Sequence, residues 1–142
     1  MLALGLSACA PSLTPLYRDF EMPADSMTTA EVIPILEAAL TDAGWDIAEP
    51  TTPNVVATQR KTLSEWGLYR VEAYLEAAPL GGNYVRLFVH PQRRFITGGR
   101  SKIPFLVPSL RRSILPDINE AFQKHGLQMA KSARERGLVE PS

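Results

Sequence analysis

The sequence has 142 residues, with 15 Lys+Arg against 15 Asp+Glu, and this formal net charge of zero argues against a nucleic-acid-binding protein. Hydrophobic residues make up 45% and charged residues 21%, so wholesale disorder is excluded and one domain is expected. The charge is uneven along the chain. Residues 1–59 hold eight acids and one base, a sum of −7, whereas residues 60–116 hold ten bases and three acids, a sum of +7.

The chain opens with a short apolar stretch that ends at the only cysteine of the sequence, Cys9. This stretch is too short to span a bilayer, which needs about 20 apolar residues. Its last residues, Leu6-Ser7-Ala8, together with Cys9, resemble the lipobox of bacterial lipoproteins. The stretch departs from that pattern because no Lys or Arg precedes it. The alternative is that Cys9 is an ordinary thiol.

The lipobox resemblance implies cleavage before Cys9, a diacylglycerol on its thiol and acylation of the new N-terminus. It therefore implies a lipid-anchored protein of the cell envelope, and Ala10 suggests the outer membrane, facing the periplasm. Residues 1–8 are then part of a signal segment and residues 9–27 a lipidated tether. Within this tether, residues 16–20 are equally compatible with an edge strand and with a loop.

A capping box predicts the first helix, because Thr28 can accept from the Glu31 N–H while the Glu31 side chain reaches back. Apolar residues follow at helical spacing over 32–43, and Gly44 closes the pattern. Pro34 either kinks this helix or marks its regular start.

Four strand-like segments follow, at residues 45–48, 54–63, 67–76 and 83–90. The last two alternate between apolar and polar residues, as strands buried on one face do. To place their apolar residues side by side, paired residue numbers must sum to an even value, most simply 160, so the intervening loop should have an odd length or a bulge. The pairs expected on the polar face are Tyr74 with Arg86, Glu72 with Phe88, and Arg70 with His90.

The rest of the sequence predicts a turn at residues 97–102, a proline-broken apolar segment at 103–108 and a helix restarting at Pro116 that His125 caps. The 97–102 segment could instead form an anion-binding nest, and the apolar segment could be an exposed lip rather than a loop packed under a helix. The predicted fold is α+β, in the order α-β-β-β-β-α, with an antiparallel sheet of about four strands and both helices on one face. This single domain spans residues 28–127, and residues 128–142 form a polar tail.

Signs of catalysis are scarce. His90 and His125 stand alone without metal-ligand spacing, and no nucleophile elbow occurs, so we expect neither an enzyme nor a metal or cofactor.

The strongest feature after the lipobox is a basic block, because residues 77–116 hold seven bases and no acid. Six of the seven are arginines, which suit bidentate contacts with phosphate or carboxylate. The candidate binding residues are the seven bases and three neighbouring aromatic residues: Arg86, Arg93, Arg94, Arg100, Lys102, Arg111, Arg112, Tyr74, Tyr84 and Phe88.

These residues predict a non-enzymatic, lipid-anchored binding or scaffolding module. Its partner would be an acidic protein of the envelope, an anionic lipid or lipopolysaccharide, and not nucleic acid. An equally weighted alternative is that the basic block faces the acidic first third of its own chain. The alternative function is a carrier or sensor of an anionic lipid or glycolipid.

Overall fold

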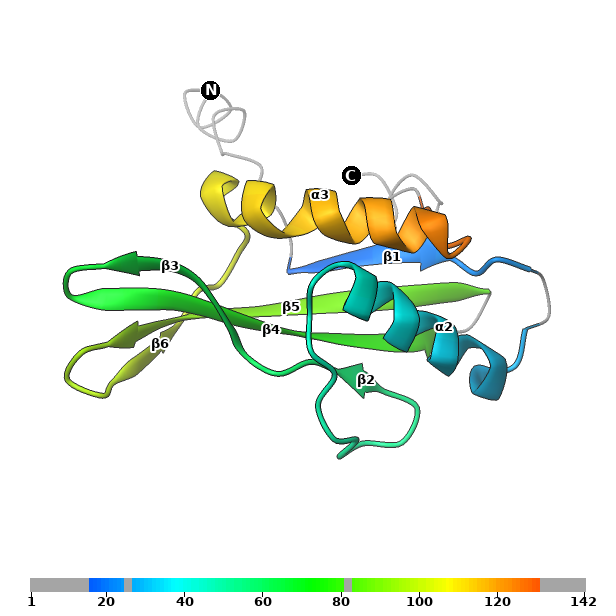
Figure 1. Ribbon diagram of the computed structural model, residues 1–142, viewed down its shortest axis with the longest axis horizontal. Helices are drawn as coiled ribbons and strands as arrows, with labels where there is room; N and C mark the ends of the chain where they lie inside the picture. Colours follow the sequence, from blue (N-terminus) through cyan, green and yellow to red (C-terminus); the bar gives the residue numbers. More distant parts are fainter. Residues whose placement is uncertain (1–15, 25–26, 81–82, 131–142) are drawn as a thin grey trace, which may run out of the picture.

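The computed structural model describes residues 16–24, 27–80 and 83–130 (Figure 1). Cys9 and the predicted signal segment lie outside these residues. The described elements, in chain order, are β1 (Tyr17–Glu21), α2 (Thr29–Asp42), β2 (Val56–Ala57), β3 (Lys61–Trp66), β4 (Tyr69–Leu80), β5 (Tyr84–Phe95), β6 (Arg100–Lys102), α3 (Pro108–Lys124) and β7 (Gln128–Met129). The fold is α+β, with one antiparallel sheet and two helices.

The sheet is organised around a long hairpin of β4 and β5, each 12 residues in length. Their paired residue numbers always sum to 164, so that Leu75 lies opposite Val89 and Ala77 opposite Leu87. The even sum and the odd loop length are as predicted, but the predicted sum of 160 is wrong by four. Tyr74 therefore lies opposite His90 rather than Arg86, and Arg70 lies opposite Arg94.

The two halves of this hairpin have different neighbours. In the near half, next to the connecting loop, β2 pairs with β4 and β1 pairs with β5, with β7 beyond β1. In the far half, β3 pairs with β4 and β6 pairs with β5. Figure 1 shows that this far half extends past the ends of both helices.

Helix α2 begins at the predicted capping box. The Glu31 N–H donates to Thr28 Oγ1, and the Thr28 N–H donates to Glu31 Oε2, both at 3.2 Å. Pro34 is the sixth residue of this helix, so the regular helix does not start there, as one of the two interpretations predicted. Gly44, just beyond the helix, has a φ of +94°, a conformation that glycine adopts without strain.

Helix α3 starts at Pro108 and continues through Pro116, so the predicted restart at Pro116 is wrong. Pro116 lies on the exposed side of this helix, whereas the neighbouring Leu115 is buried. The apolar segment before it is a loop packed into the core, with Ile103 and Leu106 each 3% exposed, as one of the two interpretations predicted. His125 caps the C-terminus as predicted.

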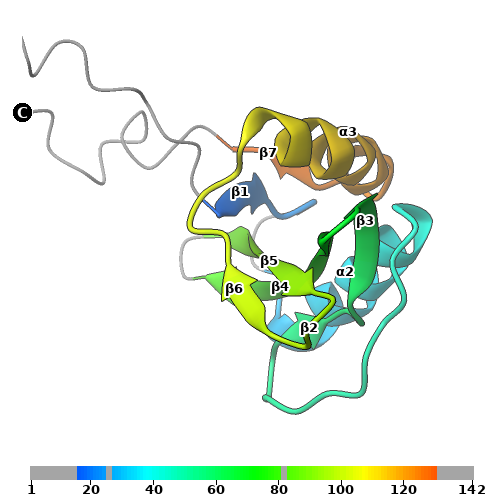
Figure 2. The same ribbon diagram turned by 90° about the vertical axis from the view of Figure 1, so that its left-hand side faces the viewer.

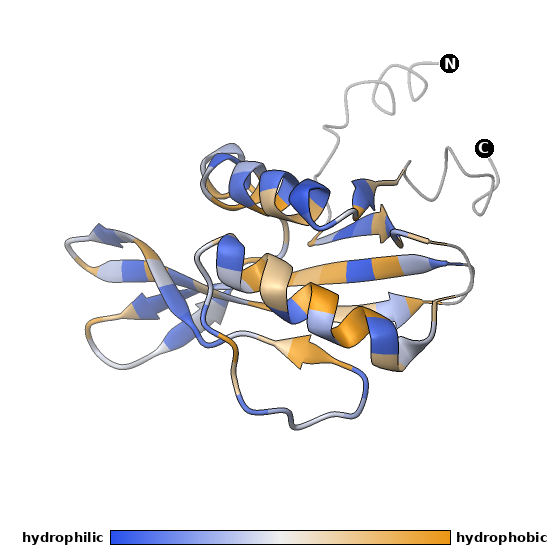
Figure 3. Cartoon of the chain, turned by 45° about the vertical axis from the view of Figure 1, so that its right-hand side comes forward, coloured by the Kyte–Doolittle hydropathy of each residue, from blue (hydrophilic) through white to orange (hydrophobic). Residues whose placement is uncertain are grey.

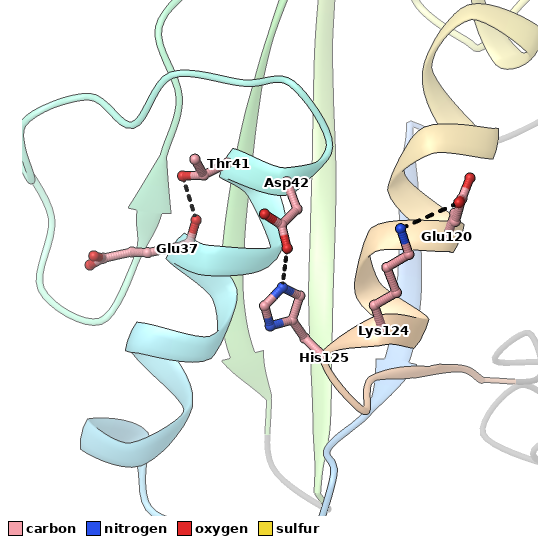
Figure 4. Close-up of polar contacts among 6 residues, drawn as sticks. All are labelled: Glu37, Thr41, Asp42, Glu120, Lys124 and His125. Atoms are coloured by element: carbon pink, nitrogen blue, oxygen red, sulfur yellow. Dashed lines mark hydrogen bonds and ion pairs between the residues drawn. The ribbon is translucent and has the colours of Figure 1, made fainter.

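One hydrophobic core joins the inward face of the hairpin to both helices. Within it, the rings of Phe20 on β1 and Phe122 on α3 lie 4.5 Å apart between centroids, and both are buried. At the helix ends, His125 contacts Asp42 and so links α3 to α2 (Figure 4).

The predicted strand count and order need correction. The described sheet has seven strands rather than about four, and a strand precedes the first helix. The segment at 45–48 forms only an isolated bridge through Ile47, and the segment at 54–63 divides into β2 and the start of β3. Strands β1 and β7 lie outside the span of 28–127 predicted for the domain. No described helix is long and apolar enough to cross a membrane.

Replacing Phe20 with alanine should destabilise the fold by about 3–5 kcal/mol, because it removes a fully buried ring and leaves a cavity against Phe122. Urea unfolding would measure this change in the free energy of unfolding. Leu68→Ala is the control, since this side chain is 70% exposed and its loss should change stability by less than about 0.5 kcal/mol. Equal effects from the two substitutions would contradict the assignment of Phe20 to the core.

Candidate functional site

The pleat of β4 and β5 turns one row of polar and aromatic side chains away from the helices. We call this surface the outer face. Its side chains come from alternate residues of each strand, because successive side chains point to opposite faces. It carries, from the near end to the far end of the hairpin, the paired residues Glu76 and Phe88, Tyr74 and His90, Glu72 and Gln92, and Arg70 and Arg94.

At the near end of the outer face, Arg86 is paired within the molecule. Its Nε and Nη2 donate to the two carboxylate oxygens of Asp19 on β1, at 2.7 and 3.0 Å. The guanidinium also lies 4.2 Å from the centroid of the Tyr17 ring. The hydrogen bond to Asp19 raises the pKa of Arg86, against partial burial, which lowers it. Arg86 thus joins the acidic first third of the chain to the basic block.

The centre of the outer face is aromatic. The rings of Tyr74 and His90 stack with centroids 4.5 Å apart, and Phe88 lies 6.4 Å from His90 on the other side. Arg60 lies over the Tyr74 ring. His90 Nε2 is 2.6 Å from Glu76 Oε1, an ion-pair distance, but the direction of approach leaves this nitrogen without a hydrogen bond.

The far end of the outer face carries three arginines on three adjacent strands. Arg70 lies opposite Arg94, and Arg94 lies opposite Arg100. We call these three residues the arginine row. Arg70 lies 3.6 Å from Glu72, whereas the side chains of Arg94 and Arg100 form no ion pair or hydrogen bond with the described residues. Like charges at directly opposite positions repel, so the row favours an added anion.

Next to the arginine row, two side chains each bury one polar atom that has no hydrogen bond within the described part of the chain. Glu72 is only 6% exposed, and its Oε1 has no hydrogen bond within the described part of the chain. The Nε2 of Gln92, directly opposite, also lacks one. Buried polar groups without partners are costly and are rare in folded proteins, so these two mark a place where the fold does not satisfy itself.

Two turns meet beyond the arginine row. The β3–β4 turn and the β5–β6 turn are joined by a hydrogen bond from the Ile96 N–H to the Leu68 carbonyl at 3.1 Å. The side chains of Trp66, Leu68 and Ile96 are 61%, 70% and 74% exposed. We call these three residues the tip residues. Two of them, Trp66 and Ile96, line an open cleft of about 420 Å³ together with Arg70 and Arg94.

Figure 2 views the molecule from the side of these turns, and Figure 3 shows that hydrophilic and hydrophobic colours alternate along this end. The β5–β6 turn is tight. The Phe95 N–H donates to the Gly99 carbonyl, and Gly98 has a φ of +95°. A hairpin turn is therefore present as predicted, but it lies between Phe95 and Arg100, and residues 100–102 of the predicted turn form strand β6 instead.

The ten residues predicted as a binding surface fall into three groups. Tyr74, Tyr84, Arg86, Phe88, Arg94, Arg100 and Lys102 lie on the outer face by strand register. Arg93 is on the inner face, where its guanidinium lies 5.9 Å from the Tyr69 ring centroid and lines a cleft beside α3.

The third group, Arg111 and Arg112, lies on exposed positions of α3 and belongs to neither sheet face. Arg111 is near Arg18, a half-buried residue whose pKa is lowered by burial and by the positive charge of Arg111. The basic block is thus continuous in sequence but divided among three surfaces.

Sequence reasoning missed four contributors to the far end: Arg70, Glu72, Gln92 and the exposed Trp66. Arg70 and Glu72 were predicted to lie on the polar face, but opposite His90 and Phe88 rather than opposite Arg94 and Gln92. Trp66 had a usable signal, because a large aromatic residue beside Gly67 is often at a hairpin turn.

No protein-family model matches the chain, and no curated protein is significantly similar to it.

Two arginines on β5 should respond differently to the same substitution. Arg86→Met removes two charged hydrogen bonds from the buried carboxylate of Asp19 and should destabilise the fold by about 1.5–3 kcal/mol, the range for hydrogen bonds to charged groups. Arg94→Met removes repulsion with its two arginine neighbours and should leave stability within about 0.5 kcal/mol or raise it. Chemical unfolding of both variants measures the difference, and equal destabilisation would contradict the proposed division of the outer face.

Proposed function

We propose that this chain is a lipid-anchored lipoprotein of the bacterial envelope whose folded domain is a non-enzymatic binding module. The observation that carries this proposal is the arginine row, in which Arg94 and Arg100 have no anionic partner among the described residues. The row lies at the exposed end of a hairpin that is rigidly held at its other end. An anionic partner is therefore the chemistry that this surface fits.

The contrast with Arg86 supports the same proposal. Asp19 satisfies Arg86 within the fold, in agreement with the alternative that the basic block faces the acidic first third of the chain. That alternative accounts for Arg86 but not for the arginine row, which is at the opposite end of the hairpin. The binding role is therefore assigned to the arginine row and Lys102, which lies opposite Gln92.

Both histidines support binding rather than catalysis. His90 lies beside Glu76 within an aromatic stack, and His125 contacts Asp42 at the ends of the two helices. Each thus has a local structural role, and among the described residues neither histidine contacts a serine or cysteine that it could activate.

Reversing the charges of Arg94 and Arg100 to glutamate should abolish co-purification of a partner from detergent-solubilised native membranes. The thermal midpoint should be unchanged or slightly raised, because the fold gains no contact from these two side chains. The matched control is Arg111→Glu with Arg112→Glu, which alters charge equally on α3 and should leave the partner bound. A partner retained by the first variant, or lost equally from both, would contradict the proposal.

Mass spectrometry of the protein purified from membranes tests the anchor. We expect cleavage before Cys9 and the added mass of a diacylglycerol and one further acyl chain, and Cys9→Ser should remain unprocessed. The same spectrum, recorded under native conditions, separates the alternative function. A carrier of an anionic lipid or glycolipid would show a further ligand mass beyond the Cys9 lipid, whereas a binding module would not.

A further inference from the structure

The two turns at the far end of the hairpin present a combination that the binding of an anionic protein does not require. Three large apolar side chains, Trp66, Leu68 and Ile96, are more than half exposed at adjacent turns. They lie at the end of the hairpin that extends past the helices (Figure 1). A projecting apolar end surrounded by cations is the usual form of a segment that enters the interface of a membrane.

Charge complementarity identifies the surface. The arginine row lies within two residue pairs of the turns that carry the tip residues, and Lys102 lies one pleat farther along β6. Glu65 is the one acid among the described residues that line the cleft at this end. Cations placed a few ångströms behind apolar side chains match the layering of a bilayer, in which phosphates lie above the acyl chains. Tryptophan is the side chain that most favours this boundary.

Strand β1 starts at its end nearer to the turns. Strand β1 runs from Tyr17, opposite Phe88, to Glu21, opposite Tyr84, and so away from the turns. Tyr17 is seven residues short of Phe95 in this register, roughly 23 Å along the strand. Tyr17 is eight positions after Cys9, and a fully extended chain of eight residues spans at most about 29 Å. The lipid and the turns can therefore reach one membrane.

We propose that the tip residues insert into the interface of an anionic phospholipid membrane while the arginine row binds the lipid phosphates. This inference rests on the proposed function and names its partner. The Cys9 lipid and the tip form two separate contacts with one surface, and their joint effect is to orient the domain on the membrane. A single lipid anchor alone leaves the orientation free.

Vesicle binding tests this proposal with the full chain carrying Cys9→Ser, which cannot be lipidated. Large vesicles of phosphatidylcholine with 30% phosphatidylglycerol should bind the protein at low salt, and vesicles of phosphatidylcholine alone should bind it at least about tenfold more weakly. Trp66 reports insertion directly. Its fluorescence should shift to the blue on binding, whereas Trp45 is already buried and should not respond. Trp66→Phe should remove the shift but not the binding.

Three variants in the same background give the proposal its contrast. Arg94→Glu with Arg100→Glu should weaken binding to the anionic vesicles by at least about tenfold. Leu68→Ser with Ile96→Ser should weaken it comparably while the thermal midpoint stays unchanged, because both side chains are exposed. Arg111→Glu with Arg112→Glu should bind within about twofold of the parent, since α3 does not face the membrane in this arrangement.

Absence of binding to anionic vesicles, or binding retained by both the Arg94→Glu/Arg100→Glu and the Leu68→Ser/Ile96→Ser variants, would overturn the membrane inference. Its failure is distinguishable from that of the proposed function. One outcome is that Arg94→Glu with Arg100→Glu loses a protein partner from native membranes while the parent does not bind vesicles. The proposed binding module would then be supported, and its partner would be an acidic protein. If Arg94→Glu with Arg100→Glu retains both a protein partner and vesicle binding, the arginine row has no binding role and both proposals are wrong.

Discussion

The register of the β4–β5 hairpin is the constraint on which the rest of this structure depends. Pairing Leu75 with Val89 places the apolar residues of both strands on one face, where the two helices cover them. A slip of one residue between the strands would turn polar side chains such as Arg86 and Glu76 toward the core, at a cost comparable with the whole stability of a domain this size. The same register therefore determines both faces of the hairpin, the apolar inner face and the charged outer face. The order of residues on the outer face cannot change without changing the inner face as well.

The outer face changes in character along its length. At the near end, Asp19 and Arg86 neutralise each other within the sheet and fasten β1 to the hairpin. At the far end, Arg94 lies between two further arginines, and the buried Glu72 beside them lacks a hydrogen bond on one oxygen. Repulsion within the far end is tolerable because most of the apolar contacts that hold the hairpin are in the near half. Local departures from good pairing in an otherwise consistent fold are typical of functional surfaces.

Much of this architecture could be predicted from the sequence, and the failures have specific physical causes. Alternation in β4 and β5 predicted the buried face, and the capping box predicted the start of α2. The strands β6 and β7 have only three and two residues, too few for a period to be visible. The register was wrong by four because the pleat fixes only whether the pair sum is even, while the glycine-rich loop permits several odd lengths. The arginine row could not be foreseen for the same reason, since it exists only when Arg70 pairs with Arg94.

The two halves of the hairpin differ in how firmly the rest of the fold holds them. Its near half pairs with β1 and β2 and packs against the core. Its far half pairs only with the six residues of β3 and the three residues of β6. Of the buried apolar residues on the hairpin, only Val71 belongs to the four residue pairs next to the turns. Bending or local opening of this end would therefore expose little of the core and would leave the near half intact. Such a construction lets the free end change its side chains, and with them its contact surface, over evolutionary time without loss of the fold.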